Sequence, residues 1–137
     1  MLTITASLRD EMFRHARSAA PAEACGMLIA PMGYAFPLRF EPLRNVAADA
    51  RRFFETDPLE VMALYREMDV RGEDPVAIVH SHVATPAEPS GVDLATAVHA
   101  GMRYVILSLA PEEIRCWFIS DGAAEEEVVE VVSPDSP

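Results

Sequence analysis

The chain has 137 residues, of which half are hydrophobic and about a quarter are charged, a composition typical of a globular domain. Its net charge of −11 disfavours nucleic-acid binding, which depends on basic groups that neutralise phosphates. No apolar run is long enough to cross a bilayer, and the N-terminal sequence lacks the basic-then-apolar pattern of a signal peptide. We therefore expect a cytoplasmic protein in which residues 1–137 form a single domain, with no membrane or nucleic-acid partner.

The N-terminal part of the sequence predicts one helix followed by a hairpin. Apolar side chains recur with a helical period over residues 8–20, where Ser7 is available as the N-cap and Pro21 ends the helix. Residues 24–40 predict two strands, which are separated by a Pro-Met-Gly turn at residues 31–33.

The middle of the chain predicts two helices and a buried strand. Residues 42–57 are expected to form a connection that contains a short strand. A helix is predicted over Pro58–Arg71, because Asp57 suits the N-cap and proline suits the first helical position. The sequence "PVAIVHSH", residues 75–82, predicts a strand buried on both faces, and a third helix is predicted from Ser90 to Gly101. The helix predicted over Pro58–Arg71 should bury one broad apolar face, made by Leu59, Val61, Met62, Leu64, Tyr65 and Met68.

The C-terminal part predicts three strands. Two apolar strands are expected within residues 102–110 and 113–120, and one final strand within residues 121–132. Residues 133–137, "SPDSP", are expected to be a frayed tail. The predicted order is therefore helix, three strands, helix, strand, helix and three strands. This order indicates an α/β domain with a central mixed sheet flanked by about three helices.

Two of the four histidines, His80 and His82, stand one residue apart at the end of the strand predicted for residues 75–82. Residues i and i+2 of a strand point to the same side of a sheet, so these two imidazoles can face one metal ion. The pair alone is a weak signal, because such spacings also occur by chance.

Ser90 and Asp93 follow the histidines and admit two interpretations. Their spacing matches a capping box, in which the serine caps a helix and the acid reaches back to the serine backbone. Alternatively, the carboxylate of Asp93 completes a His-His-Asp ligand set with His80 and His82. Three nitrogen and oxygen ligands with an open fourth position are typical of a catalytic zinc ion.

A hydrolytic zinc site also needs a general base. Glu23 is the candidate, since it lies between a predicted helix and an almost wholly apolar strand. The alternative is an ordinary exposed glutamate between two elements. Glu88 is a rival base, but acids in proline-flanked loops are usually solvated. His15 and His99 are interpreted as helix-surface or helix-end residues.

Together these residues resemble the JAMM motif of the catalytic MPN (JAB/MPN/Mov34-type) metalloproteases. In this sequence the motif consists of His80-Ser81-His82, seven residues, Ser90, two residues and Asp93, with Glu23 upstream of the strand sequence "CGMLI". The resemblance implies that His80, His82 and Asp93 bind one Zn²⁺ ion. It also implies that Glu23 acts as general base and then general acid, and that Ser90 stabilises the oxyanion.

The resemblance covers nearly the whole chain. The sequence "LRNVAADARRFFETDP" resembles the family segment before the second helix, and "IRCWFISDGAAEEEVVEV" resembles the C-terminal strands of small bacterial members. Two positions depart from the family: Val83 stands where many members have proline, and Val79 where a bulky residue is common.

The resemblance implies a zinc-dependent peptidase or isopeptidase that acts on the C-terminal tail of a ubiquitin-like sulfur-carrier protein of the ThiS/MoaD type. Some relatives of this kind release a C-terminal amino acid such as cysteine. One alternative is a non-catalytic MPN scaffold that binds a protein partner, although such members usually lose motif residues. Another is an MPN-like domain of DNA metabolism, which the acidic charge disfavours.

Overall fold

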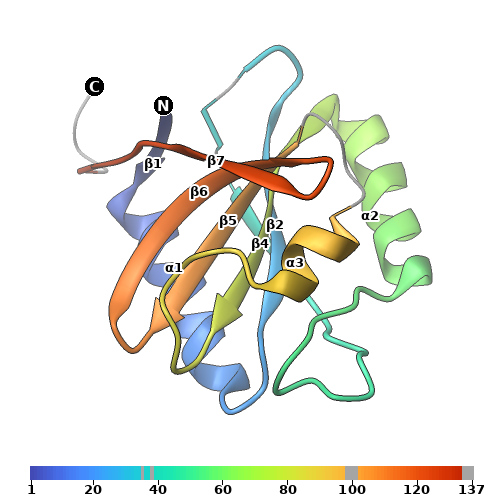
Figure 1. The fold of residues 1–137 in the computed structure, drawn as a ribbon. Coiled ribbons are helices and arrows are strands. Elements are labelled where there is room, and N and C mark those ends of the chain that lie inside the picture. The colour runs from blue at the N-terminus through green and yellow to red at the C-terminus, as the bar shows by residue number, and fades with distance from the viewer. Residues whose placement is uncertain (35, 38, 98–101, 134–137) are drawn as a thin grey trace.

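The computed structural model describes residues 1–34, 36–37, 39–97 and 102–133 (Figure 1). The elements within these residues are β1 (Leu2–Thr5), α1 (Ala6–Ala19), β2 (Cys25–Pro31), β3 (Arg39–Leu43), α2 (Pro58–Arg71), β4 (Glu73–His82), α3 (Gly91–Thr96), β5 (Arg103–Leu109), β6 (Glu112–Ser120), β7 (Ala123–Glu127) and β8 (Val129–Val132). Within the same residues, no helix has the length and apolar character needed to cross a membrane.

The main sheet is mixed and has the strand order β3-β2-β4-β5-β6-β7. Strands β4 and β5 run parallel, and the other neighbouring pairs run antiparallel. A parallel pair needs a crossover connection, and α3 lies in the connection between β4 and β5. The prediction of an α/β fold with a central mixed sheet and three helices is confirmed for the described residues.

Helices lie on both faces of the sheet (Figure 1). On one face, α1 packs together with β1 and β8 over a core that includes Phe13 and Leu28. On the opposite face, Leu64 and Met68 of α2 cover β2, and Leu94 of α3 packs with residues of β4, β5 and β6. The sheet is therefore buried on both sides, as the apolar sequence of β4 predicts.

The two chain ends differ from the prediction. Residues Leu2–Thr5 form β1, which pairs in parallel with β8, and Thr5 rather than Ser7 caps α1. Where one final strand was expected, the structure has β7 and β8. A four-residue strand such as β1 carries little periodic signal, and its partner lies at the other end of the sequence, so only tertiary pairing reveals it.

Three expectations for the middle of the chain are also wrong. The expected short strand in residues 42–57 is an isolated bridge between Asn45 and Thr56. Helix α3 ends at Thr96, and residues 98–101, which include the predicted helix end, lie outside the described residues. The apolar face of α2 is narrower than expected, because the helix rests on the sheet along the stripe of Leu64 and Met68, which are buried, with Val61 and Tyr65 packed beside them. Leu59 and Met62 lie off that stripe and are exposed.

We expect Gly26→Ala to destabilise the fold. A Cβ atom at Gly26 in β2 would stand 2.7 Å from the backbone oxygen of Glu41 and about as close to the ring of Phe40. The neighbouring backbone of β3 cannot move without breaking its ladder, so we expect a loss of about 1–3 kcal/mol in the free energy of unfolding. Urea denaturation measures this loss. Gly91→Ala is the control, because a Cβ there meets nothing within 4 Å, and an equal loss in both variants would contradict the steric explanation.

Candidate metal centre

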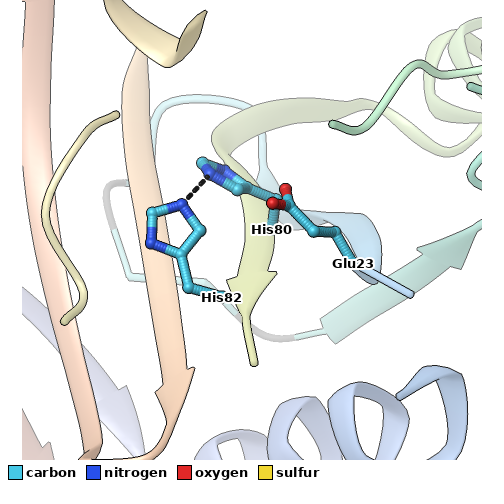
Figure 2. A group of neighbouring side chains, drawn as sticks. All are labelled: Glu23, His80 and His82. Atoms are coloured by element: carbon cyan, nitrogen blue, oxygen red, sulfur yellow. Dashed lines mark hydrogen bonds between the residues drawn. The ribbon is translucent and has the colours of Figure 1, made fainter. Parts of the chain in front are cut away.

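His80 and His82 lie at the end of β4, with their imidazole rings close to each other (Figure 2). Both rings contact α3, so their side chains lie on the face of the sheet that this helix covers. Both are buried, with 1% and 5% of their surface exposed. Their Nε2 atoms are 3.3 Å apart. The spacing of two residues along a strand thus brings both imidazoles to one point, as the sequence predicts.

Asp93, in the first turn of α3, completes this convergence. Its Oδ2 atom lies 3.1 Å from the Nε2 atom of His80 and 3.1 Å from that of His82. For bond lengths of 2.0–2.1 Å, the edges of a tetrahedral zinc site measure about 3.3 Å. The three donor atoms therefore fit one side of such a site, and imidazole nitrogen with carboxylate oxygen is a donor set that suits zinc.

The capping box is present as well. The Ser90 hydroxyl accepts a hydrogen bond of 3.0 Å from the Asp93 backbone N–H, and the Asp93 Oδ2 atom accepts one of 2.9 Å from the Ser90 N–H. The same carboxylate oxygen thus faces both the helix N-terminus and the histidines. The two interpretations of this motif are compatible, because the cap itself orients the carboxylate toward His80 and His82.

Glu23 is buried, with 7% of its surface exposed, so the interpretation as an exposed glutamate is wrong. Strands β2 and β4 are antiparallel, with Cys25 opposite His80, and extending this register places Glu23 beside His82. Donor atoms of Glu23, His80 and His82 all lie within 4.8 Å of one another (Figure 2). Within the described residues, the Glu23 Oε1 atom has no hydrogen-bond partner. A buried carboxylate oxygen without a partner is costly, which indicates that it has a ligand or reactant to meet.

The backbone of Glu23 is held by the connection between β3 and α2. Its N–H donates to the Ala50 carbonyl at 2.7 Å, and the Asn45 side-chain amide donates to its carbonyl at 2.9 Å. The same amide donates to the Phe53 carbonyl at 2.9 Å. Asn45 therefore ties the connection to Glu23, a contribution that carries no local signal in the sequence.

The electrostatic environment shifts the pKa values of the four ionisable groups in different directions. Burial raises the pKa of Glu23 to about 8, although the nearby His82 opposes this shift. Burial acts to raise the pKa of Asp93 too, but hydrogen bonds with His80 and His82 and from the Ser90 backbone outweigh it and hold that pKa far below its usual range. Burial lowers the pKa of His80. For His82, burial is outweighed by hydrogen bonds to Asp93 and to a backbone carbonyl, and the pKa rises.

We expect Glu23 to make the metal-free protein less stable as pH rises from about 4.5 to about 8. The folded state binds the Glu23 proton more tightly than the unfolded state does. The contribution of the protonated Glu23 to the free energy of unfolding is therefore fully present below the unfolded pKa, and it is lost as pH rises to the folded pKa. Glu23→Gln removes this loss. Chemical denaturation of the metal-free proteins at pH 5 and pH 8 should show that the variant gains stability relative to the wild type at the higher pH. A stability difference that does not change between the two pH values would contradict the buried carboxyl.

Two further contacts orient the imidazoles. The His82 Nδ1 atom lies 3.0 Å from the Pro86 carbonyl, to which it donates, and this fixes the tautomer that leaves Nε2 free as a ligand. The ring of Phe54 stacks on that of His80, with centroids 4.4 Å apart and an angle of 19° between the planes. Sequence reasoning assigned no role to Phe54 or Pro86, because both contacts depend on how loops pack against β4.

A cleft of about 640 Å³ borders the site at His80 and Asp93. It lies between residues 47–49 and 53–56 on one side and α3 on the other. The cleft thus reaches two of the residues whose donor atoms converge.

The other candidate residues lie elsewhere. Glu88 is exposed, and its carboxylate accepts a hydrogen bond of 3.0 Å from Arg115, as expected for a solvated loop acid. The His15 Nε2 atom lies 3.0 Å from the Cys25 carbonyl and does not join the site. His99 lies outside the described residues.

The sequence matches the family described as "Prokaryotic homologs of the JAB domain" over residues 5–120. It is 40% identical over 135 residues to CysO-cysteine peptidase from Mycobacterium tuberculosis (strain ATCC 25618 / H37Rv), a match that covers 96% of this chain and 92% of the relative. It is 34% identical over 111 residues to desampylase from Haloferax volcanii, covering 78% of this chain and 80% of the relative.

Solved structures show the same fold. A protein from Desulfitobacterium hafniense superposes with a TM-score of 0.86 at 32% identity, covering 97% of this chain and 94% of the other. A JAB1/MPN domain protein from Archaeoglobus fulgidus superposes with a TM-score of 0.60 at 21% identity, covering 97% and 100%. These matches confirm the resemblance to the JAMM/MPN proteins that the motif indicates. The chain belongs to the prokaryotic homologues of the JAB domain.

Proposed function

We propose that this chain is a zinc-dependent peptidase of the JAMM type, which hydrolyses an amide bond at the C-terminal tail of a ubiquitin-like sulfur-carrier protein. The observation that carries the proposal is the convergence of the donor atoms of His80, His82 and Asp93 within 3.3 Å of one another. Beside them lies the Glu23 Oε1 atom, which has no hydrogen-bond partner within the described residues. The names of the two relatives, CysO-cysteine peptidase and desampylase, support the class of reaction and of substrate.

The residues divide between binding and proton transfer. A zinc ion held by His80, His82 and Asp93, one per chain, would supply Lewis-acid chemistry by polarising the scissile carbonyl and acidifying a water molecule. The Glu23 Oε1 atom accepts the proton of the attacking water and passes it to the leaving amine nitrogen, so that the carrier tail departs as a free carboxylic acid. The Ser90 hydroxyl accepts the Asp93 N–H, which leaves its own hydrogen available to donate to the oxyanion.

The cleft offers a place for an extended tail. In the connection that lines it, the Phe53 carbonyl and the Glu55 N–H are both bound by Asn45. The backbone groups of Phe54, between them, have no hydrogen-bond partner within the described residues. A peptide that adds as a strand could pair with these groups, and such pairing suits a tail with small side chains because it needs only the peptide backbone.

The test is cleavage of two fusions of one ubiquitin-like carrier, either with an extra C-terminal cysteine or joined through an isopeptide bond to a lysine side chain. We expect the zinc-loaded chain to cleave at least one fusion, a chelator to abolish cleavage and added zinc to restore it, as followed by mass spectrometry. Preference between the fusions identifies the residue released. A purified chain that binds no zinc and cleaves neither fusion would favour the non-catalytic scaffold.

A further inference from the structure

The loop at residues 83–89, which joins β4 to the start of α3, is held to β6 through a single buried residue. Ala87 is fully buried. Its N–H donates to the Glu113 carboxylate at 2.8 Å, and its carbonyl accepts a hydrogen bond of 3.0 Å from the Trp117 indole. Both backbone groups of Ala87 are thus bound by side chains, in a manner that resembles the pairing of one residue in a sheet ladder.

Arg115, which lies between Glu113 and Trp117 on the same face of β6, adds a third contact to the loop. Residues 113, 115 and 117 alternate along the strand and therefore share a face. The Arg115 Nη1 atom donates to the Glu88 carboxylate at 3.0 Å, and its guanidinium lies 4.8 Å from the centre of the Trp117 ring. Two further guanidinium contacts of 2.7 Å bind Glu126 of β7, so Arg115 is itself fixed.

The same loop is connected to the proposed zinc ligands on both sides. Before Ala87, the Pro86 carbonyl accepts the Nδ1 hydrogen of His82 at 3.0 Å, and the Thr85 carbonyl accepts the Ser108 hydroxyl at 2.6 Å. Ser90 lies three positions after Ala87, and its backbone N–H donates a hydrogen bond to the Asp93 carboxylate. A shift of Ala87 would therefore move both the acceptor that orients His82 and the cap that orients Asp93.

We propose that Glu113 and Trp117 are positioning residues, which hold the backbone of Ala87 and so set the spacing between the imidazole of His82 and the carboxylate of Asp93. Neither residue touches the converging donor atoms. The bond to Glu113 is charge-assisted, since a carboxylate accepts it, and such bonds are stronger than neutral ones. This role rests on the proposed function, because it concerns how the residues assigned to zinc are held.

The test compares four variants with the wild type in the full chain. Glu113→Ala removes the acceptor, Glu113→Gln keeps an acceptor oxygen in a side chain of the same shape, and Trp117→Phe removes only the donor and part of the ring. Glu112→Ala is the matched control, because Glu112 is the neighbouring glutamate on the opposite face of β6, where it binds Arg17 of α1. Each variant is examined for its melting temperature, for hydrogen exchange of the 83–89 loop without metal, and for its zinc dissociation constant by competition with a chelator.

We expect faster exchange of the loop and about tenfold weaker zinc binding in Glu113→Ala and Trp117→Phe, as is typical when a partner that orients a metal ligand is lost. Glu113→Gln and Glu112→Ala should stay close to the wild type. If Glu113→Ala unfolds, Trp117→Phe and the rescue by glutamine still decide the result. Unchanged zinc binding in Glu113→Ala and Trp117→Phe, or equal losses in Glu112→Ala, would overturn the positioning role alone. A wild-type chain that binds no zinc would instead overturn the proposed function and this role with it.

Discussion

Glu23→Gln should abolish hydrolysis while leaving zinc in place. Glutamine has nearly the shape of glutamate, but its amide cannot accept the proton of the attacking water. The Glu23 carboxyl is buried, and its Oε1 atom has no hydrogen-bond partner within the described residues. Losing a general base costs roughly two to four orders of magnitude in rate. The measurement is kcat/KM on the carrier fusions, together with the zinc content of each preparation.

This result also decides whether Glu23 is a base or a ligand. Glu23 lies within 4.8 Å of the two histidines and could in principle bind an ion itself. The distances favour Asp93, whose Oδ2 atom stands 3.1 Å from both Nε2 atoms. Glu11→Gln, on the exposed side of α1, is the matched control and should retain full activity. Loss of zinc from Glu23→Gln would show that Glu23 is a ligand, and full activity in that variant would remove its assignment as base.

Asp93→Asn should lose zinc. Asparagine keeps the size of the side chain and an oxygen that can accept the Ser90 N–H, so α3 can still begin where it does. The substitution removes the negative charge between His80 and His82 and offers them an amide in place of a carboxylate ligand. We expect zinc affinity to fall by more than the roughly 10–100-fold that follows loss of a partner beyond the ligands. Chelator competition measures the affinity, and the melting temperature of the metal-free protein reports on the fold.

Ser90→Ala distinguishes the role of Asp93 as a metal ligand from its role in the helix cap. It removes the acceptor for the Asp93 N–H but leaves every proposed ligand in place. The loss of an N-cap costs about 0.5–2 kcal/mol of stability, so this variant should melt earlier than the wild type, and it should bind zinc more tightly than Asp93→Asn does. Equal zinc affinities in the two variants would mean that Asp93 acts through the cap and not as a ligand.

Local patterns in the sequence were sufficient for several features. The Asp57 cap and the proline after it place the start of α2 at Pro58, where the structure has it. The apolar run of β4 predicts a strand buried on both faces, and the alternation of His80 and His82 predicts that their side chains share a face. Each of these features depends on residues within one turn of helix or a few positions of strand, so the local sequence contains the information.

Contacts between segments far apart in the chain were harder to predict from the sequence. The parallel pairing of β1 with β8 joins the two ends of the chain, and neither strand is long enough to predict the other. The apolar stripe of α2 was predicted to be broader than it is, because the sequence does not show that Leu59 and Met62 lie beyond the line along which the helix packs on the sheet.

The sequence by itself determined which chemical groups the site contains: two imidazoles on one face of a strand, a serine and an aspartate at a helix start, and an upstream glutamate. Their identities and local spacings follow from the periods of strand and helix. Only the tertiary structure decided that these groups meet. The antiparallel register of β2 on β4 brings Glu23 to the histidines, and the contacts of Ala87 with β6 hold the loop that leads to α3, in which Asp93 lies. Distances between atoms far apart in sequence depend on strand register and loop packing, which arise only when the whole sheet is assembled.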